Sequence, residues 1–288
     1  MSNPSQSIAA LVLAYSRFEL LQQLIAALRT QTRPPDEIIV VYQGSTHGID
    51  AWLATQPDLH VIRQSNRGSA GGFCTGIEES LRRGHRWTWI FDDDAVPTPN
   101  ALEELVNCPG FSASDTAFLA SRIVDRNGTT YMSPSAAEGN RWYGTVLRDR
   151  CVEVVHACWV GVLVNSDAVR RSGLPISEFF LCEEDLEFTA RLARTGRAYC
   201  PVESIVVHFQ DAVFDPFGKD FLKNAYYTRN RIARAKVEPG NVFTKTVRSL
   251  SRTAYFLWLV ATKKAPARTI PWIARGLFMF WPRIRYPS

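Results

Sequence analysis

The first 120 residues alternate between short apolar runs and segments in which apolar side chains recur at helical spacing. Helices are predicted where Leu21, Leu24, Ile25 and Leu28 share one face, over residues 72–83, and from Asn100 onward. The apolar runs, each of strand length, are residues 8–13, 38–42, 59–62, 87–91 and 116–120. This alternation predicts an α/β fold with a mostly parallel central sheet flanked by helices, in which ligands bind at the carboxyl ends of the strands.

The pattern changes after residue 126. Residues 127–149 are rich in Gly, Ser and Arg, which predicts loops that cover a site. Strands are predicted over 152–164 and 199–209, and helices over 166–172 and 183–195. We therefore expect one catalytic domain over residues 1–240.

Residues 241–288 form a basic, aromatic tail. They hold nine of the 33 Lys and Arg residues and no Asp or Glu, which leaves 24 basic against 28 acidic side chains in residues 1–240, a net charge of −4 there. The apolar segments 254–261 and 271–281 are shorter than the roughly 20 residues that cross a bilayer. They predict a C-terminal helical segment that lies in a membrane interface, or packs on the catalytic domain or on a second copy in a homo-oligomer.

Composition narrows the class of protein. With 288 residues, 46% of them hydrophobic, the chain can bury a large core. Its six cysteines are scattered and include no CxxC pair, so they are predicted to be reduced. The first strand follows the N-terminus without a basic leader, which predicts a cytoplasmic protein, peripheral at the inner face of the membrane. Nucleic-acid binding is disfavoured because the basic residues of the tail alternate with bulky aliphatic ones.

The acidic triplet Asp92-Asp93-Asp94 directly follows the apolar strand 87–91. Extended geometry would place the side chains of Asp92 and Asp94 on the same side. A divalent cation offsets the repulsion among adjacent carboxylates, and hard oxygen ligands suit Mg²⁺ or Mn²⁺, which in turn bind phosphate oxygens. The alternative is a solvated acidic turn, although such turns seldom interrupt a core strand.

A second acidic cluster, Glu183-Glu184-Asp185, begins a predicted helix. Acidic residues favour the first helical turn electrostatically, but the preceding apolar residues 179–182 could also desolvate a carboxylate that serves as a general base. His208 ends a predicted strand; it is either a structural histidine or a third metal ligand, because imidazole is acceptable to Mn²⁺.

Residues 66–73, Asn-Arg-Gly-Ser-Ala-Gly-Gly-Phe, join a predicted strand to a predicted helix. The glycines Gly71 and Gly72 would let the backbone approach a ligand, and the first turn of the helix offers free N–H groups. A plain glycine-rich turn is the alternative. The segment matches neither the dinucleotide-binding fingerprint nor the P-loop, so hydride transfer and ATP hydrolysis gain no support.

Taken together, these motifs resemble glycosyltransferase family 2, whose members have the GT-A fold. The resemblance covers residues 8–210 and rests on the order Ala14-Tyr15-Ser16-Arg17, the Asn-x-Gly…Gly-Gly turn, the Asp triplet, the Glu-Asp pair and a later His. The segments 71–73 and 91–95 look most like bacterial galactofuranosyltransferases, with rhamnosyltransferases as close neighbours.

The resemblance implies inverting transfer from a nucleotide-sugar donor. Asp92, Asp94 and His208 would bind Mn²⁺ or Mg²⁺, Asp185 would deprotonate the acceptor, and Glu184 would assist. The metal would neutralise charge on the leaving diphosphate while the base strengthens the incoming oxygen. The residues expected to contact the donor are Tyr15, Arg17, Gln43, Asn66, Gly71, Gly72 and Asp93.

The donor and acceptor are expected from the same resemblance. The first choice is galactofuranose from its UDP derivative, added to a glycan or lipid-linked glycan during cell-surface polysaccharide synthesis; rhamnose or another hexose is the alternative. Gln43 stands where the family often has Asp or Asn, so it would contact the nucleotide through a neutral amide. The chain is shorter than polymerising galactofuranosyltransferases, which favours single additions.

Three aromatic or imidazole side chains, Trp142, His156 and Trp159, are candidates to contact the acceptor sugar, with burial as the alternative for the tryptophans. A carbohydrate- or lipid-binding scaffold without catalysis is the non-enzymatic hypothesis. It predicts a decayed acidic centre, whereas both acidic clusters and His208 are present.

Overall fold

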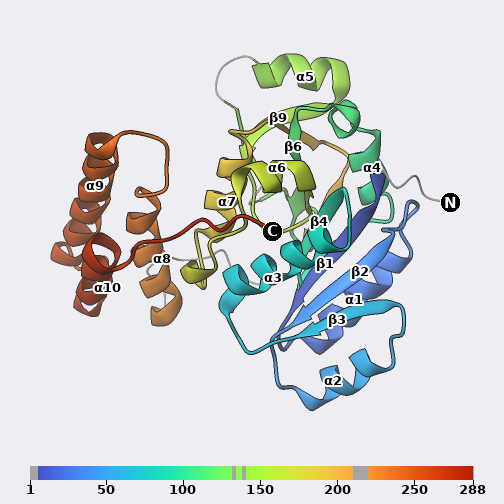
Figure 1. Ribbon diagram of the computed structural model, residues 1–288, viewed down its shortest axis with the longest axis horizontal. Helices are drawn as coiled ribbons and strands as arrows, with labels where there is room; N and C mark the ends of the chain where they lie inside the picture. The colour runs from blue at the N-terminus through green and yellow to red at the C-terminus, as the bar shows by residue number, and fades with distance from the viewer. Residues whose placement is uncertain (1–5, 132–133, 138–140, 210–219, 288) are drawn as a thin grey trace.

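The computed structural model describes residues 6–131, 134–137, 141–209 and 220–287 (Figure 1). Its α/β body is built on a sheet that has nine strands within these ranges, in the order β3-β2-β1-β4-β10-β6-β11-β9-β8. A small sheet, β5-β12-β7, lies beside it. The helices α8, α9 and α10 form a separate group at one end of the molecule, and the chain then returns to the body (Figure 1).

The first half follows the predicted alternation closely. Strand β1 is buried throughout and pairs in parallel with both β2 and β4. The elements are β1 (Ile8–Ala14), α1 (Phe18–Arg29), β2 (Glu37–Tyr42), α2 (His47–Ala54), β3 (Leu59–Arg63), α3 (Gly68–Arg82), β4 (Trp87–Asp92), β5 (Ala95–Pro97), α4 (Ala101–Asn107), β6 (Thr116–Ala120) and β7 (Arg122–Val124). Strands β1, β2 and β4 therefore end at one edge, where ligands bind in such sheets.

The second half is less regular than predicted. The elements are β8 (Ser135–Ala136), α5 (Arg141–Asp149), β9 (Cys151–His156), β10 (Val162–Asn165), α6 (Ser166–Ser172), α7 (Glu184–Leu192), β11 (Arg197–Pro201) and β12 (Ile205–His208). Strand β10 is antiparallel to both β4 and β6, so the sheet is mixed rather than mostly parallel. All four residues of β10 are buried, and such a run carries no signal of strand direction.

Two predicted segments differ in detail. The stretch 127–149, expected to be loops, contains helix α5. The single strand expected over 199–209 is two strands in different sheets, because residues 202–204 turn the chain. The buried Ser204 holds this turn through hydrogen bonds to the Ala101 carbonyl and to the Ser121 hydroxyl. Among the smaller predictions, the six cysteines are free thiols, as expected.

The C-terminal helices share a small core of their own. Helix α8 (Phe221–Arg234) contributes Ile232, which packs with Phe256 and Leu259 of α9 (Val242–Ala261) and with Ile273 of α10 (Ile270–Ala274). The boundary expected at residue 240 thus falls between helices that pack together. No helix in the described ranges combines the length and the apolar character that a membrane span requires.

Candidate active site

A cavity of about 600 Å³ opens at the carboxyl ends of β1, β2 and β4. Its other walls come from the start of α3, the segment after β9, the segment before α7, the end of β12 and helix α8. The cavity brings together most of the residues expected from sequence: Tyr15, Arg17, Gln43, Asn66, Asp92, Asp93, Asp94, His156, Trp159, Glu184, Asp185 and His208.

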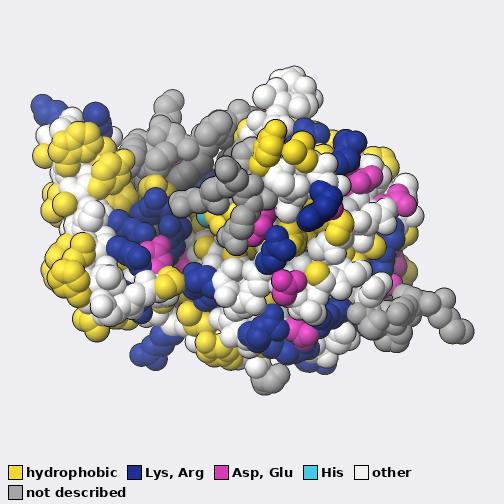
Figure 2. Space-filling model, turned by 90° about the horizontal axis from the view of Figure 1, so that it is seen from above, with side chains coloured by type: hydrophobic (Ala, Val, Ile, Leu, Met, Phe, Trp, Pro, Cys, Tyr) yellow, Lys and Arg dark blue, Asp and Glu magenta, His cyan; other side chains and the backbone are white. Residues whose placement is uncertain are grey.

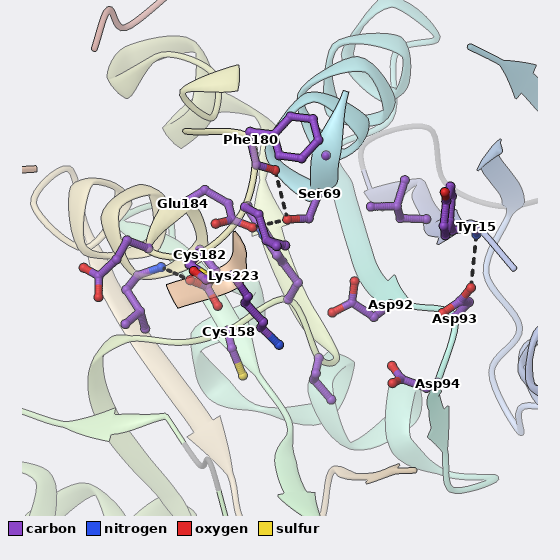
Figure 3. Close-up of a pocket in the computed structure, with 18 of the residues that line it drawn as sticks. Tyr15, Ser69, Asp92, Asp93, Asp94, Cys158, Phe180, Cys182, Glu184 and Lys223 are labelled. Carbon is purple, nitrogen blue, oxygen red and sulfur yellow. Dashed lines mark hydrogen bonds between the residues drawn. The ribbon is translucent and has the colours of Figure 1, made fainter. Parts of the chain in front are cut away.

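The acidic triplet forms one wall. Figure 3 shows the carboxylates of Asp92 and Asp94 on the same side and that of Asp93 turned toward Tyr15. Strand β4 ends at Asp92, so Asp93 and Asp94 lie in the turn that follows it rather than in an extended strand. The Asp93 carboxylate accepts the Tyr15 backbone N–H at 3.1 Å and the Arg17 guanidinium at 2.6 Å. Arg17 also lies 3.1 Å from an Asp94 oxygen. The cation therefore spans the middle and last carboxylates of the triplet.

Asp92 carries the least compensated charge of the three. Its carboxylate accepts no hydrogen bond from the part of the chain that the structure describes. Burial, reinforced by the charges of Asp94 and Asp93, raises the pKa of Asp92 well above its ordinary value. A carboxylate so placed gains most from a cation in the cavity.

His208 reaches the triplet through strand pairing. Strand β12 runs antiparallel to β5 with His208 opposite Ala95, and this register puts the His208 Nε2 atom 3.3 Å from Asp94 Oδ1. The Tyr131 hydroxyl lies 2.7 Å from Nδ1 and fixes the ring. Burial raises the pKa of Asp94, but the hydrogen bond and charge of His208 outweigh it, so the pKa is lowered.

The side chains at this wall have the chemical types that bind a divalent cation. Asp92 and Asp94 supply oxygen atoms and His208 supplies an imidazole nitrogen, the combination that suits Mn²⁺. Over the described ranges, however, no three His, Cys, Asp or Glu side chains already converge as a formed metal cluster.

The second acidic cluster forms the opposite wall, at the start of α7. The Glu184 carboxylate accepts a hydrogen bond from the Ser69 hydroxyl at the start of α3 (Figure 3). Burial, with the charge of Asp185, raises the pKa of Glu184 to about 8. Burial also raises the pKa of Asp185 to about 6, although the Leu186 N–H bonds its carboxylate at 2.7 Å. The two neighbouring carboxyls thus share a desolvated place in which both pKa values are raised.

The glycine-rich segment is folded differently from the expectation. Helix α3 begins at Gly68 rather than near Gly72. Gly71 and Gly72 do not line the cavity, so the structure does not bring these two expected donor contacts to the site. Gly72 is needed for packing instead, because a side chain there would overlap Leu13 of β1.

Gln43 and Asn66 both lie at the cavity and both shape the turn before α3. The Gln43 amide oxygen accepts the Arg67 N–H at 2.9 Å, and its nitrogen donates to the Gly68 carbonyl at 3.0 Å. The Asn66 side chain accepts the Gly68 N–H at 2.8 Å. Gln43, at the end of β2, thus holds the turn in place and uses most of its amide for that purpose.

The acceptor candidates have different fates. His156 lines the cavity at the end of β9, where burial, together with the charge of Arg234, lowers its pKa. Trp159 is 3% exposed, and its ring packs against Phe73 and Phe188 with centroids 4.7 and 5.5 Å away. These contacts occupy its faces, so the expected stacking on a sugar is not supported. Trp142 lies in α5, and its side chain is outside the described residues.

Sequence reasoning missed the contribution of helix α8. Lys223 and Tyr227 from this helix line the cavity, as does Ser69 of α3. Three polar residues of α8, Asn224, Thr228 and Asn230, are buried in the structure. The sequence shows that they are polar, but it does not show that they are buried. The spacing of polar residues along a helix does not show which part of the cavity the helix covers.

Solved structures of other proteins share this fold. The Staphylococcus aureus TarS fragment 1–349 aligns over 95% of this chain and 81% of its own, with a TM-score of 0.63 and 14% identity. GalNAc-T7, solved with UDP, GalNAc and Mn²⁺, aligns over 90% of this chain and 57% of its own, with a TM-score of 0.60 and 11% identity. At such identities the likeness shows the fold alone, and that fold is GT-A, as predicted.

Sequence comparison then gives the family. The chain belongs to glycosyl transferase family 2, whose sequence model matches residues 10–171, and it is a glycosyltransferase. Galactofuranosyltransferase GlfT1 of Mycolicibacterium smegmatis is 25% identical over 202 residues, 67% of each chain. GlfT1 of Mycobacterium tuberculosis H37Rv is 24% identical over 201 residues, 67% of this chain and 66% of the relative. The prediction of a family 2 enzyme resembling galactofuranosyltransferases is confirmed.

Proposed function

We propose that this glycosyltransferase is an inverting, metal-dependent enzyme that transfers galactofuranose from UDP-galactofuranose to a glycan or lipid-linked glycan in cell-surface polysaccharide synthesis. One observation carries the proposal: the acidic triplet and the carboxyl pair Glu184 and Asp185 line a single cavity. The names of the GlfT1 relatives support the choice of sugar.

The residues divide the work by their position. Asp92, Asp94 and His208 would hold Mn²⁺ or Mg²⁺, which would neutralise charge on the leaving diphosphate; the neighbour GalNAc-T7 was solved with Mn²⁺ and UDP. Asp185, on the opposite wall, accepts the proton of the incoming hydroxyl. Its pKa of about 6 is close enough to pH 7 for an effective general base and low enough for the carboxylate to be available.

Glu184 has a different task from its neighbour. With a pKa of about 8 it keeps its proton at pH 7 and acts as a hydrogen-bond donor to a sugar oxygen rather than as a second base. On the donor side, Arg17 is placed to exchange its contact with Asp94 for a phosphate when a cation joins the triplet. Tyr15, Gln43 and Asn66 supply the nucleotide wall.

A donor screen tests the proposal. Purified protein would be incubated with UDP-galactofuranose, UDP-galactopyranose, UDP-N-acetylglucosamine and dTDP-rhamnose, with Mn²⁺ or with EDTA, and release of the nucleoside diphosphate would be measured. We expect metal-dependent release from UDP-galactofuranose that falls by about 10²-fold or more in Asp94→Ala and in Asp185→Ala. Asp50→Ala, at an exposed carboxylate paired with Arg63, is the matched control and should keep full activity.

Each other outcome of the screen has a definite meaning. Full activity of Asp94→Ala or Asp185→Ala would refute the assigned roles. Preference for dTDP-rhamnose would replace the proposed donor with that of the rhamnosyltransferases. Donor binding without turnover under every condition would instead indicate a carbohydrate-binding scaffold.

We further propose that the α9–α10 end of the molecule rests on an anionic lipid surface, at the inner face of the membrane, where a lipid-linked acceptor would be found. Figure 2 shows hydrophobic side chains gathered at this end, with Lys and Arg beside them. The exposed large apolar side chains there include Val242, Phe243, Leu250, Trp258, Phe278, Met279 and Trp281. The lack of acidic residues in 241–288 makes the surface complementary to anionic headgroups.

Vesicle co-sedimentation of the full chain tests this placement. Binding to vesicles with anionic phospholipid should exceed binding to neutral vesicles and should weaken in the double variant Phe278→Ser, Met279→Ser. Leu147→Ser, an exposed apolar residue on α5, is the control. If the double variant binds anionic vesicles as well as the wild type does, the lipid contact is refuted. If the wild type is a dimer in analytical sedimentation and the double variant is a monomer, the surface instead contacts a second copy of the chain.

A further inference from the structure

The segment that leads into the catalytic carboxylates has an unusual backbone. Phe180, Cys182 and Glu183 have φ angles of 65°, 68° and 70°, and they are three of the five non-glycine residues with positive φ in the described chain. L-residues avoid this left-handed region because the Cβ atom approaches the carbonyl oxygen. Such a conformation persists only where surrounding contacts impose it.

Asn230 of α8 provides the most direct of those contacts. Its side-chain nitrogen lies 2.9, 2.8 and 2.8 Å from the backbone carbonyl oxygens of Phe179, Leu181 and Cys182, which share its two N–H donors. The residue is fully buried. One amide group therefore gathers three carbonyls of the loop and points them toward α8.

Charged groups of α8 complete the attachment. Arg229 donates to the carbonyls of Glu178 and Phe179 at 2.9 and 2.8 Å. The buried Glu183 carboxylate lies 3.2 Å from Arg231 and 2.7 Å from Arg234. Glu183 is thereby held by two cations of α8, beside Glu184 and Asp185 in the wall of the cavity.

We propose that Asn230 is a positioning residue for sugar transfer: it fixes the left-handed loop 179–183 so that Asp185 faces the acidic triplet across the cavity. This inference rests on the proposed function, because it assumes that Asp185 is the base. Asn230 itself does not line the cavity, so it acts through the loop. Displacement of a catalytic group by about 1 Å costs about 100-fold in rate.

The test compares two variants of buried α8 residues. Asn230→Asp keeps the shape of the side chain but replaces the donor with an acceptor that faces three carbonyls. Thr228→Val is the matched control, since Thr228 is equally buried and its hydroxyl has no hydrogen-bond partner within the described chain. Steady-state kinetics would give kcat and the donor KM, and hydrogen exchange would follow the amides of residues 178–186.

We expect Asn230→Asp to lower kcat by about 100-fold while the donor KM stays within about twofold, because the donor wall lies on β1, β2 and β4. Exchange of the loop amides should become faster in this variant and remain unchanged in Thr228→Val. Unchanged kcat and unchanged exchange in a folded Asn230→Asp would overturn the proposal. Equal losses of kcat in both variants, with lower melting temperatures, would also overturn it, since they would show a packing role alone.

A second variant covers the case in which Asn230→Asp does not fold. Arg231 is 38% exposed, and Arg231→Gln removes one of the two cations on Glu183. It should lower kcat several-fold with an unchanged donor KM, and unchanged kcat with unchanged exchange would count against the proposal. Faster loop exchange in either variant, with no transfer by the wild type on any donor, would leave the attachment to α8 standing and would refute the proposed function instead.

Discussion

Asp185→Asn should make the protein more stable at neutral pH while it removes the base. Burial is the main reason that the pKa of Asp185 is raised from its ordinary value of 3.8 to about 6 in the folded state. A carboxyl with a raised pKa binds its proton more tightly when folded than when unfolded. Its ionisation therefore destabilises the fold: the penalty is absent below pH 3.8, grows between the two pKa values, and is complete above about pH 6.

The magnitude follows from the difference in pKa. A rise of about two units corresponds to about 3 kcal/mol of unfolding free energy once Asp185 is fully ionised. An asparagine avoids this penalty and can still accept the Leu186 N–H, although its amide nitrogen needs a partner. We therefore take about 3 kcal/mol as the upper limit, which is roughly 6 °C in melting temperature for a domain of this size.

Thermal unfolding of both proteins between pH 4 and pH 8, with EDTA present, tests this reasoning. The difference in melting temperature should be near zero at pH 4, rise through pH 5, and reach a plateau of roughly 2–6 °C above pH 6.5. Asp50→Asn, at an exposed carboxylate, should show no such pH-dependent gain. If Asp185→Asn has a melting temperature at pH 8 equal to or lower than that of the wild type, the ionisation of Asp185 does not destabilise the fold and this reasoning is refuted.

Three further changes probe other parts of the site. Arg234→Gln should shift the acidic limb of the kcat–pH profile to higher pH, because the charge of Arg234 lowers the pKa of Asp185. An acidic limb at the same pH as in the wild type would contradict this. Tyr131→Phe removes the hydroxyl that orients His208, so the activating concentration of Mn²⁺ should rise about 10–100-fold, and an unchanged metal titration would argue against His208 as a ligand. Gly72→Ala should cost about 1–3 kcal/mol in urea unfolding, because its Cβ overlaps β1; unaltered stability would contradict that packing.

The predictable part of the site lies next to regular strands. Asp92, Asp93 and Asp94 come at the end of a strand whose apolar run is unmistakable. The outer two carboxylates do lie on one side, but through the turn at residues 93–94 and not through strand alternation. The glycines are less informative, because a glycine pattern is the same whether the backbone approaches a ligand or another element of the fold. At Gly72 the neighbour is Leu13 of β1, which local sequence does not reveal.

The amino-acid sequence by itself determined the alternation of strands and helices in the first half, the family, and the two acidic clusters, because each depends on residues close together in the chain. Only the tertiary structure decided which clusters meet. The antiparallel pairing of β12 with β5 brings His208 to Asp94, and helix α8 orients the loop before Asp185. Periodicity fixes the face that a strand or helix buries, but the partner of that face follows from contacts between distant segments.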